Sequence, residues 1–120
     1  METTENPSRC PTTRLAFVLD GNTRIDYSPA TRYGDVKLVF DQREEKPSIW
    51  STLYYEHAVD RMVKQDYDPD LDYLVAAGSQ VPLLLLVATL VAKFGQVNLL
   101  LFDSTTSEYI HKRVSIDAVN

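Results

Sequence analysis

The stretch from residue 71 to residue 102 restricts the fold of this chain more than any other part of the sequence. An apolar strand is followed by a break at Gly78-Ser79, a helix that is apolar on nearly every face and, after Gly95, a second apolar strand. Two strands that are joined by a helix form a parallel pair with a right-handed crossover. The elements that this pattern predicts are a strand over 71–77, a helix over 81–94 and a strand over 97–102.

Shorter patterns predict the elements on either side of this βαβ unit. Two apolar runs end in aspartate turns, and a helical repeat of apolar residues follows Ser48, which can cap the helix. The predicted elements are strands over 15–19 and 36–40, a helix of about 16 residues after Ser48, and an antiparallel edge strand over 108–116. The chain order β-β-α-β-α-β-β therefore predicts an α/β fold with two helices and a small mixed sheet of about four to five strands.

The length of 120 residues indicates a single domain. We expect this α/β domain over 14–117, with a flexible N-terminus over 1–13 and a C-terminal tail over 118–120. Residues 73–92 carry no charge and match the length of a membrane span, but Gly78 and Pro82 interrupt them. A buried strand and helix are therefore expected there, and no membrane association.

The balance of charges limits the classes of partner. With 17 acidic and 12 basic side chains, the formal net charge is −5, which argues against a dedicated nucleic-acid-binding protein. Cys10 is the only cysteine, so the sequence excludes intrachain disulfides and indicates a reducing compartment. Because the polar first residues lack the pattern of a signal peptide, we expect a soluble protein of the cytoplasm.

Three apolar strands end in aspartate, at Asp20, Asp41 and Asp103. If these strands are parallel and adjacent, the three carboxylates lie at the edge of the sheet where open α/β folds place their ligands. Carboxylate oxygens are the ligands that Mg²⁺ prefers, so these aspartates are candidate metal ligands. The alternative interpretation is structural, because aspartate is a favoured turn residue after any strand.

Gly78 and Ser79 are candidate phosphate-binding residues, since they join a strand to the N-terminus of a helix. The alternative for Ser79 is a simple helix cap. The sequence contains no Walker loop, no G-x-G-x-x-G run and no hydrolase or metalloprotease motif. His57, His111 and Cys10 therefore read as structural or surface residues, and the chain reads more as a binding protein than as an enzyme.

An aromatic cluster forms the third candidate site. Trp50, Tyr54 and Tyr55 are candidate interface residues, because tryptophan and tyrosine bury a large area and keep a polar atom for hydrogen bonding. At helical spacing such residues also form cores, and both interpretations stay open. The apolar helix over 81–94 supports an interface as well, since a chain of this length has few elements to cover it.

The stretch IDYSPATRYGD over 25–35, together with DYLVAAGS, VNLLLFD and SEYIHKRV within 68–114, resembles small uncharacterised proteins carried by bacteriophages. The resemblance implies a shared fold and a viral origin, and it implies no activity for any residue.

The leading hypothesis is a small non-enzymatic accessory protein that binds a protein partner. One alternative is a phosphate- or nucleotide-binding protein or Mg²⁺-dependent phosphate enzyme that uses the strand-end aspartates. Another is a structural subunit that assembles as a homo-oligomer.

Overall fold

The computed structural model describes residues 13–20, 25–41 and 43–116. Its elements are β1 (Leu15–Asp20), the 3-10 helix η1 (Ser28–Arg32), β2 (Asp35–Phe40), α1 (Thr52–Lys64), β3 (Tyr73–Ala76), α2 (Gln80–Phe94), β4 (Gln96–Asp103) and β5 (Glu108–Ser115). The predicted α/β class and the predicted order of strands and α-helices are confirmed. Apart from Thr13, the segment expected to be flexible at the N-terminus lies outside the described residues, as do Cys10 and the expected tail over 118–120.

The five strands form one mixed sheet in the order β2-β1-β3-β4-β5. The first four of these strands are parallel, and β5 pairs with β4 in the antiparallel direction. β3, α2 and β4 form the parallel strand-helix-strand unit that the sequence predicts, with Leu74 opposite Leu99. The spatial order differs from the chain order because β2 lies outside β1 and leaves β3 to pair with the other side of β1.

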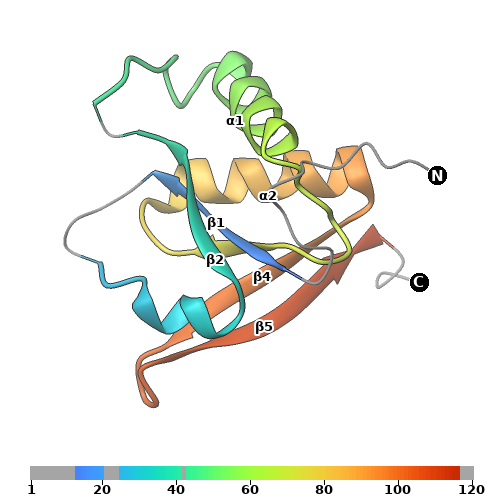
Figure 1. Ribbon diagram of the computed structural model, residues 1–120. Coiled ribbons are helices and arrows are strands. Elements are labelled where there is room, and N and C mark those ends of the chain that lie inside the picture. The colour runs from blue at the N-terminus through green and yellow to red at the C-terminus, as the bar shows by residue number, and fades with distance from the viewer. Residues whose placement is uncertain (1–12, 21–24, 42, 117–120) are drawn as a thin grey trace.

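Both α-helices lie on the same face of the sheet, where they cover the main core (Figure 1). Phe17 of β1 and Leu74 of β3 project into this core, and Met62 of α1 and Leu90 of α2 meet them from the helical layer; all four side chains have no exposed surface. The spacing of the apolar residues along α1 explains its place, since it directs one apolar stripe to the sheet, whereas α2 is apolar on nearly every face.

Among the described residues, the short helix η1 is the only helix on the opposite face of the sheet. Ala30 of η1 is fully buried against a second cluster that includes Ala16, Val75 and Leu100. Proline is compatible with the first turn of a helix, where its missing N–H costs nothing, and η1 has proline at its start.

The helix α1 begins later than predicted. Ser51, three residues after Ser48, caps it by accepting a hydrogen bond from the Leu53 N–H at 3.1 Å. Ser48 instead closes a turn, in which its Oγ accepts from the Trp50 N–H at 3.1 Å and its carbonyl accepts from the Ser51 N–H at 2.9 Å. Trp50 is therefore outside the helix.

No helix in the described part of the chain is long and apolar enough to cross a membrane, in agreement with the interruptions at Gly78 and Pro82.

Replacing two glycines by alanine tests the fold, because the two changes should lower the free energy of unfolding by different amounts. A Cβ on Gly34 would lie 2.5 Å from the carbonyl oxygen of Arg14, so Gly34→Ala should force the backbone between β1 and β2 apart. A Cβ on Gly95 would meet no atom within 4 Å, although its φ of +86° is unfavourable for alanine. We expect Gly34→Ala to lower the free energy of unfolding by about 2 kcal/mol or more and Gly95→Ala by about 1 kcal/mol.

Urea denaturation of the two variants measures this difference. Equal losses of stability would contradict the close approach of Gly34 to the start of β1.

Candidate functional site

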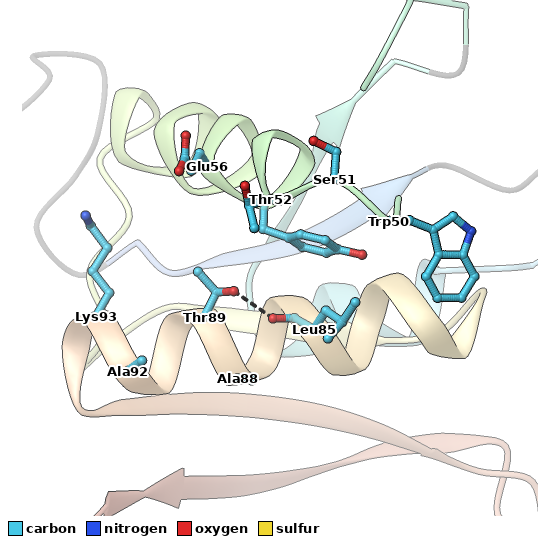
Figure 2. Close-up of a pocket in the computed structure, with 10 residues that line it drawn as sticks. Trp50, Ser51, Thr52, Glu56, Leu85, Ala88, Thr89, Ala92 and Lys93 are labelled. Atoms are coloured by element: carbon cyan, nitrogen blue, oxygen red, sulfur yellow. Dashed lines mark hydrogen bonds between the residues drawn. The ribbon is translucent and has the colours of Figure 1, made fainter. Parts of the chain in front are cut away.

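A groove of about 740 Å³ runs between α1 and α2 on the outer side of the helical layer (Figure 2). Its apolar surface comes from Trp50 and Tyr55 on one side and from Leu85, Ala88 and Ala92 of α2 on the other. Figure 2 shows Trp50 at one end of the groove and Lys93 at the other, with Glu56 on the α1 side. A second hollow of about 330 Å³ continues the groove along α1 and shares Glu56, Thr89 and Lys93 with it.

Trp50 is the most exposed large apolar side chain of the described residues, with 75% of its surface open to solvent. It stands on the loop between β2 and α1, which a double contact between Arg61 of α1 and Glu44 holds in place. Hydrogen bonds from Arg61 and from the Asp41 N–H lower the pKa of Glu44 to about 2, so this contact persists in mild acid. This loop thus presents an exposed tryptophan at the mouth of the groove.

The three aromatic interface candidates have different positions. Tyr54 is 2% exposed and packs against Phe40, and burial, with a smaller contribution from the charge of Asp20, raises its pKa to about 12. Tyr55 lines the groove, and its hydroxyl donates a hydrogen bond to the Ile49 carbonyl at 2.6 Å. Trp50 is therefore the exposed member of the three, whereas Tyr54 and Tyr55 both belong to the core and Tyr55, 6% exposed, also borders the groove.

The outer side of the helical layer exposes apolar residues that the sequence analysis did not single out. Leu84 of α2 is 66% exposed, and Leu85 beside it lines the groove. On α1, Leu53 and Val63 are about half exposed. The all-round apolar composition of residues 81–94 indicates this surface in the sequence. It does not show which face of the helix stays exposed, because apolar residues occur on nearly every face.

The three strand-end aspartates all lie at the carboxyl edge of the parallel strands, but in different surroundings. Asp41 Oδ1 accepts a hydrogen bond from the Arg43 N–H, and Asp103 Oδ1 accepts one from the Thr105 N–H, each at 2.9 Å. Both aspartates thus form turns. Asp20 Oδ2 lies 3.6 Å from Lys46 Nζ. Strand β3 separates the end of β1 from the end of β4, and among the described residues no three Asp, Glu, His or Cys side chains gather as a metal site.

Gly78 and Ser79 lie at the same edge, between β3 and α2. Gly78 has a φ of +105°, which favours glycine, and open space surrounds it. Ser79 occupies the N-cap position of α2, but its hydroxyl accepts no capping hydrogen bond, in contrast to Ser51 of α1. The phosphate and metal interpretations of this edge stay predictions.

Comparison with known proteins relates the chain to a protein family. No curated protein and no solved structure matches the chain significantly. The model of one protein family, described as Phage Pam3 gp32-like protein, matches residues 14–116, which include every strand and helix of the described structure. The chain therefore belongs to the Phage Pam3 gp32-like protein family, as its resemblance to phage proteins led us to expect.

Proposed function

We propose that this phage-family chain is a non-enzymatic accessory protein that binds a protein partner in the groove between α1 and α2. The observation that carries the proposal is the 75% exposure of Trp50 at the mouth of an apolar groove. Exposed tryptophan is costly to leave in water, and tryptophan is enriched among the residues that dominate binding free energies. The single cysteine, Cys10, supports action in the reducing cytoplasm.

The shape and chemistry of the groove favour an amphipathic helix of the partner. Ala88 and Ala92 lie one turn apart on α2 and leave room for a helix to approach closely, with Trp50 and Leu85 as apolar contacts. The charged side chains stand at the rim of the groove, where Glu56 faces it from α1 and Lys93 from α2. A partner helix with an apolar stripe and charges of both signs at its edges would satisfy this surface.

Replacement of Trp50 tests the proposal directly. We expect Trp50→Ala to weaken partner binding by about thirtyfold or more, as for a central interface residue. Ala88→Gln should have a similar effect, because a longer side chain on this exposed position occupies the groove. Both variants should keep the stability of the parent protein to within about 0.5 kcal/mol, since both sites face solvent.

The measurement is affinity capture from bacteria infected by a phage of this family, followed by titration of the captured protein. Phe102→Ala is the matched control, because Phe102 is a half-exposed aromatic residue on β4, outside the groove. Retention of the same protein by Trp50→Ala and Ala88→Gln would contradict the groove as the binding site. A dimer of the isolated chain that Trp50→Ala dissociates would make a second copy the occupant instead.

A second candidate function is binding or hydrolysis of a phosphate compound at the carboxyl edge of the sheet. Two observations favour it: the Ser79 hydroxyl is not used in capping, and buried Asp20 Oδ1 accepts no hydrogen bond from the described residues. The helix dipole of α2 would attract the phosphate, and Asp20 would contribute a ligand for Mg²⁺.

Thermal unfolding with Mg²⁺ and a nucleoside triphosphate tests this second function. A ligand at about 100 times its dissociation constant should add roughly 2.7 kcal/mol to the stability. We expect Asp20→Asn to remove that gain and Asp103→Asn to retain it, because Asp103 lies beyond β3 and already holds a turn. An unchanged melting temperature of the parent protein would rule the function out for these ligands.

A further inference from the structure

Two arginines and a histidine lie near Tyr73 on the face of the sheet opposite α1 and α2. Arg14 Nη1 donates a hydrogen bond to the Tyr73 hydroxyl at 2.9 Å. The His111 ring meets the Tyr73 ring edge to face, with 5.3 Å between the centroids. Arg113 lies two residues further along β5, on the same face as His111. We refer to Arg14, His111 and Arg113 as the cationic patch.

Asn98 of β4 holds the β5 side of the cationic patch in place. Its side chain is 2% exposed, and its Nδ2 donates to the carbonyls of Pro69 and Asp72, each at 3.2 Å. These two acceptors orient the amide, so Oδ1 faces β5 and accepts from Arg113 Nε at 2.9 Å. His111 Nε2 lies 3.0 Å from the same oxygen and must donate to it, which leaves Nδ1 without a proton in the neutral ring.

The residues of the cationic patch have only neutral hydrogen-bond partners, whereas Arg32, Arg43, Lys46, Arg61 and Lys64 each pair with a carboxylate. Elsewhere in the described structure, Arg32 pairs with Glu108, Lys64 with Asp60 and Arg61 with Glu44. No ion pair is formed by a cationic patch residue with any described carboxylate. This is notable in a chain with 17 acidic residues and a net charge of −5.

Asp70 and Asp72, two of the four aspartates between α1 and β3, use their carboxylates in other contacts. Asp70 accepts from Arg113 Nη2 at 3.2 Å through its backbone carbonyl, while its side chain accepts from Gln96 Nε2. Asp72 accepts through its carboxylate from the backbone N–H groups of Leu15, at 2.9 Å, and Asp68, at 2.8 Å. In this environment the pKa of His111 is lowered, first by burial and then by the positive charges of Arg113 and Arg14.

We propose that the cationic patch binds a phosphate group, in the form of a phosphomonoester. Arg14, His111 and Arg113 are all solvent-exposed and so accessible to a ligand. Arg113 Nη1 and the Nε and Nη2 of Arg14 donate to no described residue, and guanidinium donors match phosphate oxygens well. A phosphomonoester carries about −1.5 to −2 charges at neutral pH, which suits two arginines and a histidine better than a single carboxylate does.

A small phosphate compound fits the cationic patch better than single-stranded nucleic acid. Nucleic acid would need exposed aromatic rings on which bases stack, and Tyr73 is 5% exposed beneath the charged side chains. Bound phosphate would favour the imidazolium form of His111, which takes up its second proton at Nδ1. Binding and protonation of His111 are therefore coupled.

NMR titration with inorganic phosphate, and separately with a nucleoside monophosphate, tests the proposal at constant ionic strength in chloride. The chain has two histidines, and His57 on α1 is an internal reference on the other side of the sheet. We expect phosphate to raise the pKa of His111 and to leave that of His57 unchanged. Arg14→Gln and Arg113→Gln should each weaken the binding of phosphate about tenfold or more.

Lys112→Gln is the matched control, because it removes the same charge from the neighbouring position of β5, which faces the other side of the sheet. Phosphate binding should survive this change. Arg14 makes one side-chain hydrogen bond to the described residues, so Arg14→Gln decides the question even if Arg113→Gln destabilises the fold. An unmoved His111, an equal loss in Lys112→Gln, or binding of oligonucleotide without binding of either phosphate compound would each overturn the proposal.

Discussion

Two buried polar side chains, Asp72 and Asn98, connect four of the five strands, and the arrangement of the sheet depends on them. Asp72 precedes β3 and accepts a hydrogen bond from the first N–H of β1, while Asn98 of β4 bonds to the Asp72 carbonyl and to Arg113 of β5. They are the only buried polar residues of the described chain. Because an unsatisfied buried polar group costs about 1–3 kcal/mol, shifting the register of any of these strands would be penalised.

The second constraint is the small number of elements that cover the sheet. In the described part of the chain, two α-helices share one face and η1 alone lies on the other. No described element covers the outer side of α2 or the surface around Arg14 and Arg113. The two uncovered surfaces differ in chemistry. Leu84 and Leu85 make the first apolar, whereas Arg14 and Arg113 make the second cationic. A protein-binding groove and a phosphate site can therefore exist on opposite faces without competing for residues.

The strand-helix-strand unit was predictable because its signals are local: an apolar run, Gly78, an apolar helix and Gly95 follow one another in the chain. The spatial order of the strands was not, since the position of β2 outside β1 depends on pairing between segments about 20 residues apart in sequence. The cationic patch shows the same limit. Arg14 and Arg113 share one face only because β3 and β4 join β1 and β5 into a single sheet, and no local pattern relates the two residues.

The aromatic candidates show how one helix boundary decides a functional assignment. Trp50 and Tyr54 are four residues apart, so a helix that began after Ser48 would place both on one face, and the same environment would be expected for each. Ser51 caps the helix instead, and Trp50 belongs to the preceding turn. Tyr54 consequently enters the core, where burial raises its pKa to about 12, while Trp50 remains in solvent at the groove. Because Ser51 and not Ser48 caps α1, Trp50 stays outside the helix, whereas Tyr54 lies within it and packs in the core.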